Sequence, residues 1–207
     1  RDVRGTLQRP RPPCAVHAGD GWYLVTELRG VRRRVRLLQL PYDVRHRGAT
    51  GQLSICVARR HDHLSLRTCD LPAVEPIARD AIAAAQLSNR IGTASVDIFS
   101  EPLPNADVIT MGMILHDWNL EKKMHLIGVA YDAIPAGGAF VAIENLIEDP
   151  RRSNVFGLMM SLNMLVEFGD AFDFTGRDFD GWCREVGFAR TEVIPLRGPA
   201  SAAVAYE

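Results

Sequence analysis

The sequence predicts an α/β domain whose β-sheet is mainly parallel and closes with an antiparallel C-terminal hairpin. From about residue 48 onward, short apolar segments alternate with segments whose apolar residues recur at helical spacing. This alternation is typical of a parallel sheet covered by helices. Two of the apolar segments, ADVITMGMIL and AFVAIENLI, are hydrophobic almost throughout, as expected for strands buried on both faces. The last two segments, RTEVIPL and SAAVAYE, are joined by the short RGPA turn and predict the hairpin.

The first elements of the domain are predicted between residues 48 and 85. GATGQLSICVARR predicts a glycine turn that opens a short helix, and LSLRTCD alternates apolar and polar residues as a strand does. LPAVEPIARDAIAAA is predicted to be a helix with a proline near its first turn, where a missing N–H has no consequence.

The central elements include the most hydrophobic segments of the chain. ASVDIF predicts a strand that closes near Asp97, and ADVITMGMIL predicts the next one. NLEKKMHLIGVAYDAI predicts an amphipathic helix with Leu120, Met124, Ile127 and Tyr131 on its buried face. PAGG ends that helix, and AFVAIENLI follows as a buried strand.

Two further helices precede the hairpin. NVFGLMMSLNMLVEF predicts a strongly apolar helix, and RDFDGWCREVGF predicts a short helix that ends at a glycine. Residues 1–40, in contrast, are interrupted by Gly, Pro and Arg, and only GWYLVTEL and VRRRVRLLQL suggest regular structure.

Charge is distributed unevenly along the 207 residues. Residues 1–60 contain 13 arginines and 4 acidic residues, a net charge of +9, whereas the whole chain carries −1. A basic segment suits nucleic acid or acidic lipid, but this one lacks the interleaved aromatic residues of single-strand binders. We therefore expect no nucleic-acid partner.

Membrane, secretory and zinc-ribbon classes are also disfavoured. No apolar run reaches the roughly 18 residues that a membrane-spanning helix needs, and the N-terminal residues lack the apolar core of a signal peptide. The four cysteines are scattered without a CxxC pair. A cytoplasmic protein with reduced thiols, no membrane partner and no metal site is expected.

Polar residues follow several predicted strands where ligands bind to open α/β sheets, at the carboxyl ends. Asp70, Asp97 and Glu144 each lie at the end of a strand, and the sequence His116-Asp117-Trp118 follows another. The sequence therefore predicts a binding or catalytic site at this edge of the sheet.

Several segments resemble the catalytic domain of plant-type O-methyltransferases, which use S-adenosylmethionine and include caffeic acid, hydroxyindole and bacterial antibiotic-tailoring enzymes. The matching segments are CDLPAVEP, VDIFSEPLPNADVITMGMILHDWNLEKKMHLIGVAYDAIPAGG, AIENLI and FTGRDFDGWCREVGF. The resemblance covers residues from about 48 to 207 and implies the Rossmann-like sheet of class I methyltransferases, with S-adenosylmethionine as cofactor. Residues 46–207 would be the catalytic domain.

The resemblance assigns a set of residues to the cofactor. Asp70, with Leu71 beside it, would accept hydrogen bonds from the ribose hydroxyls, although an Asp before Leu-Pro is also a good helix cap. Asp97 would contact the adenine amino group, or else serve as a turn residue. The remaining positions are Gly48 and Gly51 in the glycine turn, Ile98 and Phe99 beside the adenine, Gly112 and Met113 near the methionine half, and Trp118 as a cover.

The resemblance also assigns catalysis. His116 would be the general base that takes the proton from the acceptor hydroxyl, a role that suits an imidazole at neutral pH. Glu144 would orient its ring, and Asp173 stands where the family more often has Glu. On the helix NVFGLMMSLNMLVEF, the acceptor would be contacted by Met159, Met160, Asn163 and Met164, although part of this stripe also suits a hydrophobic core.

Two departures from the family affect the expected function. YDVRHRGATGQ replaces the family's D-x-G-G-G-x-G turn, with Arg45 and Arg47 where small residues allow close approach to the cofactor. The family also carries a helical N-terminal domain that forms homodimers and closes the acceptor pocket, and residues 1–45 are interpreted as its basic remnant.

The leading hypothesis is an S-adenosylmethionine-dependent O-methyltransferase that acts on a phenolic hydroxyl of a small molecule. The alternative is a truncated, non-catalytic relic of the fold that serves as a binding module. A nicotinamide-dependent dehydrogenase is disfavoured, because GxGxxG does not follow the first strand.

Overall fold

The structure, a computed structural model, describes residues 42–46, 51–152, 154–196 and 198–207, with the backbone alone for residues 42–46. The predicted basic segment, apart from its last four residues, and Gly48 lie outside the described residues. No helix in the described part of the chain is long and apolar enough to cross a membrane.

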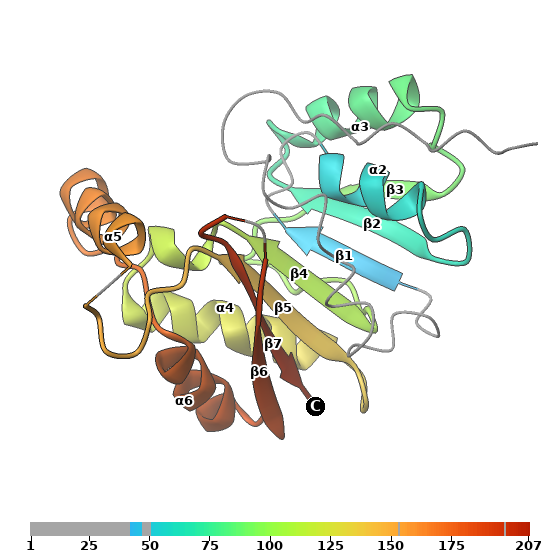
Figure 1. Cartoon of the computed structure of the whole chain (residues 1–207). Coiled ribbons are helices and arrows are strands. Elements are labelled where there is room, and N and C mark those ends of the chain that lie inside the picture. The colour runs from blue at the N-terminus through green and yellow to red at the C-terminus, as the bar shows by residue number, and fades with distance from the viewer. Residues whose placement is uncertain (1–41, 47–50, 153, 197) are drawn as a thin grey trace, which may run out of the picture.

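Seven strands form one sheet in the order β3-β2-β1-β4-β5-β7-β6 (Figure 1). Their bounds are β1 Tyr42–His46, β2 Ser65–Asp70, β3 Ile91–Ser95, β4 Val108–Gly112, β5 Ala139–Glu144, β6 Arg190–Pro195 and β7 Ser201–Tyr206. The pairs from β3 to β5 are parallel, and β7 runs antiparallel to both β5 and β6. The prediction of a parallel sheet closed by an antiparallel hairpin is therefore confirmed.

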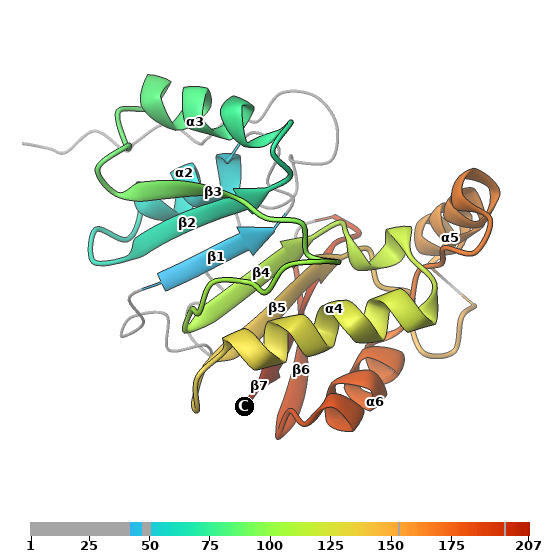
Figure 2. The same ribbon diagram turned by 180° about the vertical axis from the view of Figure 1, so that it is seen from behind.

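Helices cover both faces of the sheet. The helices are α2 Gln52–Ala58, α3 Glu75–Ala84, α4 Leu120–Ala133, α5 Val155–Phe168 and α6 Gly176–Val186. Helices α2 and α3 pack on one face over β2 and β3, while α4 and α6 pack on the other (Figures 1 and 2). Helix α5 projects beyond the end of the sheet instead of lying on a face, and most of its apolar side chains are exposed.

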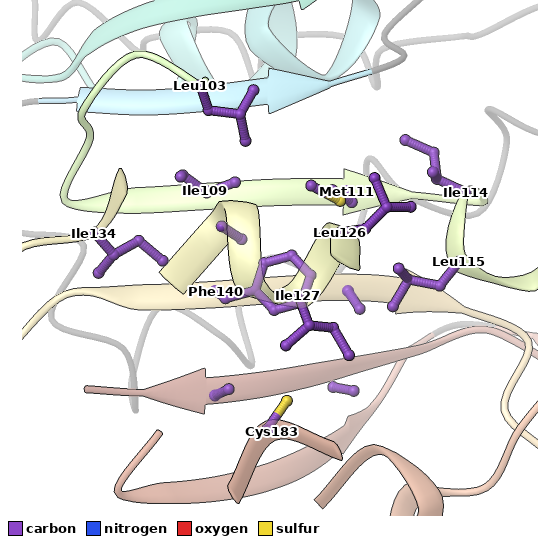
Figure 3. Close-up of a cluster of buried hydrophobic side chains, with 14 of the residues drawn as sticks. Leu103, Ile109, Met111, Ile114, Leu115, Leu126, Ile127, Ile134, Phe140 and Cys183 are labelled. Carbon is purple, nitrogen blue, oxygen red and sulfur yellow. The ribbon is translucent and has the colours of Figure 1, made fainter. Parts of the chain in front are cut away.

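The larger hydrophobic core lies between α4 and strands β4 and β5 (Figure 3). Ile109 and Met111 of β4 and Phe140 of β5 meet Leu126 and Ile127 of α4 there. These strands are buried along their whole length, which explains why their sequences are continuously apolar.

The predicted buried face of α4 was only partly right. Ile127 is buried, but Leu120 is 45% exposed and Met124 and Tyr131 are half-buried. The buried face instead contains Lys123, Leu126, Ile127, Ala130 and Ala133. The helical period was predicted correctly, but a pattern of hydrophobic residues does not predict that a lysine is buried on the core side.

Two predicted strands end at different residues from those expected. The third strand is Ile91–Ser95, paired with β2, and not ASVDIF. Asp97 lies in the following loop, where its carboxylate accepts hydrogen bonds from the backbone N–H of Phe99 and the hydroxyl of Ser100. These local bonds favour a turn over a strand. Strand β4 likewise stops at Gly112, because Met113 adopts the left-handed backbone conformation (φ 55°).

Candidate active site

The site lies at the edge of the sheet where parallel strands β2, β4 and β5 end. Asp70 and Glu144 are the last residues of β2 and β5, and Gly112 is the last residue of β4. The register pairs Gly112 with Ile143, directly before Glu144. Strands in register end at one edge, so the predicted residues are brought to the same side of the sheet.

A short 3-10 turn, η1 (Leu115–Asp117), carries His116 at this edge. Met113 begins the reversal in its left-handed conformation, which costs about 1 kcal/mol or more for a residue other than glycine. Oε1 of Glu144 accepts hydrogen bonds from the backbone N–H groups of Ile114 (3.0 Å) and Leu115 (2.9 Å). Glu144 therefore fixes the turn to the end of β5.

The His116 imidazole is buried and faces three carboxylates. Nδ1 lies 2.8 Å from Oε2 of Glu144 and 3.7 Å from Oδ1 of Asp173. The Nδ1 to Oε2 distance is that of a hydrogen bond, although the N–H direction is not aligned with it. On the opposite side of the ring, Nε2 lies 3.1 Å from Oδ1 of Asp117.

The pKa of His116 reflects this environment. Burial disfavours the imidazolium, but the contacts with Asp117 and Glu144 and the charge of Asp173 outweigh it and raise the pKa to about 10. Burial raises the pKa of the Asp173 carboxyl to about 6. A pKa in this range favours the protonated imidazole at neutral pH, with Asp117 in contact with Nε2.

Lys123 is the member of the site that sequence reasoning missed. Its side chain is fully buried, and Nζ donates a hydrogen bond to the carbonyl oxygen of Trp118. Burial lowers its pKa to about 8, against the charges of Glu144 and Asp173, which raise it. The sequence signal was its spacing: Lys123 lies three residues after Leu120 and four before Ile127, so it falls on the side of the helix that was expected to be apolar.

The predicted ribose ligand, Asp70, lies at the same edge of the sheet. Asp70 is buried at the end of β2, and its Oδ1 accepts a hydrogen bond from the backbone N–H of Leu71 (2.8 Å), whose side chain is exposed. Gly51, also buried, begins α2 in the left-handed conformation (φ 64°), which favours glycine. An acidic residue at a strand end and a glycine turn after the first strand are features of nucleotide-binding α/β folds.

The predicted adenine residues lie in the loop after β3. Ile98 is buried, while the ring of Phe99 is partly exposed and meets the indole of Trp118 edge to face at 4.9 Å. Lys122 lies over the same indole at 4.5 Å. Asp97 lies in the same loop, two residues after the end of β3.

The predicted acceptor residues on α5 have different environments. Met164 is buried and Met160 is half-buried, whereas Met159 and Asn163 are exposed. The hydroxyl of Ser161 accepts a hydrogen bond from the backbone N–H of Asp173, and α5 contacts η1. The helix therefore adjoins the cluster around His116, but half of its expected contact residues face away from the packed side.

Comparison with known proteins agrees with this arrangement. Residues 28–189 match the O-methyltransferase domain family. The chain is 35% identical over 155 residues to 3-hydroxy-5-methyl-1-naphthoate 3-O-methyltransferase of Streptomyces sahachiroi, covering 74% of this chain and 45% of that protein. It is 32% identical over 157 residues to the tetracenomycin polyketide synthesis 8-O-methyl transferase TcmO of Streptomyces glaucescens, covering 76% and 46%.

Solved structures show the same fold. PigF with S-adenosylhomocysteine superposes with a TM-score of 0.81 at 25% identity, covering 90% of this chain and 56% of that one. Human N-acetylserotonin methyltransferase in complex with S-adenosylmethionine gives a TM-score of 0.78 at 25% identity, covering 86% and 51%. The chain thus spans about half the length of the relatives it matches.

The family match covers well over half of the chain, and the strand order, the hairpin and the polar edge of the sheet agree with it. The chain belongs to the O-methyltransferase domain family, whose members include enzymes dependent on S-adenosylmethionine.

Proposed function

We propose that this chain transfers a methyl group from S-adenosylmethionine to a phenolic hydroxyl of a small aromatic molecule, with His116 as general base. The observation that carries the proposal is the 2.8 Å approach of His116 Nδ1 to Glu144. It lies at the edge of the sheet where β2 ends in Asp70, the proposed ribose ligand. The naphthoate named for one relative is an aromatic hydroxy acid, which supports a phenolic acceptor.

The cofactor, when bound, supplies an activated methyl group on a positively charged sulfur. The acceptor oxygen would take that methyl group, with S-adenosylhomocysteine as the leaving product, and Nε2 of His116 would take the hydroxyl proton. Glu144, which only accepts hydrogen bonds when ionised, keeps the other imidazole proton on Nδ1 and leaves Nε2 as the acceptor.

Asp117 determines whether His116 can act as a base. Its Oδ1 lies 3.1 Å from Nε2, where the acceptor hydroxyl has to bind, so the hydroxyl must displace that carboxylate. Displacement removes a major stabilisation of the imidazolium, and a nearby sulfonium cation disfavours it further. Both effects lower the His116 pKa from about 10 toward the range of a working base.

Binding of the cofactor is proposed to use the residues at the ends of the strands. Asp70 accepts the ribose hydroxyls, Asp97 and Phe99 contact the adenine, and Gly112 and Met113 lie near the methionine half. Gly51 leaves room for the close approach of the backbone. Met160, Asn163 and Met164 of α5 are proposed to contact the acceptor, with Trp118 as a cover over the cofactor.

Methyl transfer to a panel of phenols tests the proposal, alongside calorimetric titration with S-adenosylhomocysteine. His116→Ala should lower turnover by about 10²–10⁴-fold and leave cofactor affinity nearly intact, because a general base contributes about that much. His63→Ala, at an exposed position, is the matched control. Equal turnover by His116→Ala would rule out the base role.

The same experiment separates the enzyme from a non-catalytic binding module. A module of that kind binds S-adenosylhomocysteine without methylating any phenol, even when the N-terminal half of a relative is supplied in trans. Because the chain spans about half of its relatives' length, the assay should be run with and without that half, and turnover should rise when it is added.

A further inference from the structure

Lys123 is buried where a charge is costly unless something compensates it. Its exposed fraction is 0%, on the core side of α4, whereas its neighbour Lys122 is exposed. A buried ammonium is retained in a folded protein when opposite charges and hydrogen bonds surround it. The contacts of Lys123 therefore indicate what it does.

Those contacts join the two segments that carry the catalytic cluster. Nζ donates to the carbonyl oxygen of Trp118, the residue directly after η1. Nζ also lies 3.6 Å from the centre of the Phe172 ring, directly before Asp173. One ammonium group thus holds the turn that bears His116 and the loop that bears Asp173.

The charges around Lys123 are mainly negative. Glu144 at the end of β5, Asp117 of η1, and Asp170 and Asp173 of the loop after α5 all act on it. Oδ2 of Asp173 is buried and accepts no hydrogen bond from the described residues. Helix α5 contributes the Ser161 hydroxyl, which accepts a hydrogen bond from the backbone N–H of Asp173.

We propose that Lys123 is a positioning residue for methyl transfer: its ammonium is the buried counter-cation that keeps Asp173 ionised beside His116 and fastens the His116 turn to the Asp173 loop. The proposal rests on the function proposed above, in which His116 is the base. With a pKa of about 8, Lys123 is charged at neutral pH.

The effect on catalysis follows from where the acceptor proton goes. An ionised Asp173 stabilises the imidazolium that forms on His116. A neutral Asp173 does not, and burial already raises its pKa to about 6, against the charges of His116 and Lys123. Without Lys123, the pKa of the Asp173 carboxyl would rise further, and the imidazolium would lose part of the counter-charge that stabilises it.

The test is a carbon-13 NMR titration of the Asp173 carboxyl, identified by its loss in Asp173→Asn. In Lys123→Met, which replaces the ammonium with a similar apolar volume, the Asp173 dissociation constant should fall by about tenfold or more. Lys122→Met removes the neighbouring exposed charge and should change the Asp173 dissociation constant by less than about twofold, since exposed charges are screened. Lys123→Arg should behave like the wild type.

A reciprocal measurement covers the case in which Lys123→Met does not fold. Coupling between two sites is mutual, so Asp173→Asn should lower the Lys123 pKa below about 8, as read from its Cε resonance. An unchanged Asp173 titration in Lys123→Met, or an unchanged Lys123 titration in Asp173→Asn, would overturn the inference. An equal shift in Lys122→Met would do the same.

The pH profile of turnover distinguishes failure of this inference from failure of the proposed function. If both hold, the acidic limb of the profile in Lys123→Met moves to higher pH together with the Asp173 titration. If the Asp173 titration moves but the acidic limb of the turnover profile does not, Lys123 is the counter-cation of Asp173 and the base role of His116 is wrong.

Discussion

Replacing Glu144 with Gln tests how the site selects the proton position on His116. Two backbone N–H groups, those of Ile114 and Leu115, point at Oε1 of Glu144, so a glutamine must place its carbonyl oxygen there. Its amide NH₂ then occupies the Oε2 position, 2.8 Å from Nδ1 of His116 in the wild type. Nδ1 becomes the acceptor, the proton moves to Nε2, and the base is blocked.

The size of the effect can be worked from these contacts. The productive orientation of the glutamine requires its NH₂ to face both backbone N–H groups, with the loss of two hydrogen bonds. At about 1 kcal/mol each, the cost is about 2 kcal/mol, which leaves about 3% of molecules with the productive tautomer. Turnover should therefore fall at least about 30-fold, and up to about 10⁴-fold when the lost carboxylate charge is included.

The assay combines methyl-transfer rates with nitrogen-15 NMR of the imidazole, which distinguishes Nδ1–H from Nε2–H. Glu148→Gln is the matched control, because Glu148 also accepts backbone N–H groups, those of Arg152 and Asn154, away from His116. Unchanged turnover in Glu144→Gln, with the proton observed on Nε2, would refute the reasoning.

Three further predictions concern binding, pH dependence and association. Asp70→Ala should weaken S-adenosylhomocysteine binding by about 1.5–3 kcal/mol in calorimetry, the scale of hydrogen bonds to a charged group, whereas Asp80→Ala, at an exposed position of α3, should not. Folding stability should decrease as pH rises from 6.5 to 8, because the pKa of His116 is raised to about 10 in the folded protein. It should level off above pH 8, where the lowered pKa of Lys123 acts in the opposite sense. Denaturant unfolding at several pH values measures this, and the same decrease in His116→Gln would contradict it. Helix α5 exposes a row of apolar side chains, with Val166 at 76%, so Val166→Glu should reduce self-association in analytical ultracentrifugation, and an unchanged sedimentation profile would exclude this face.

The general course of the chain was predictable because it depends on local patterns. Buried strands β4 and β5 are continuously apolar, and the hairpin follows from two short strands around a turn. The polar edge was predictable for the same reason, since parallel strands end together and Asp70 and Glu144 close theirs. The resemblance carried by the LHDW segment then assigned roles to these positions.

The sequence by itself thus determined the fold class, the order of its elements and which strand ends carry the site. Tertiary structure decided the electrostatics: that Asp117 contacts Nε2 of His116, that Glu144 binds the backbone of the turn, and that Lys123 lies inside. The physical reason is that hydrophobic periodicity reports which face of an element is apolar on average. The position of a single charge depends instead on groups distant in the sequence, here residues 144 and 173 around residues 116 and 123, which only the packed structure brings within reach of one another.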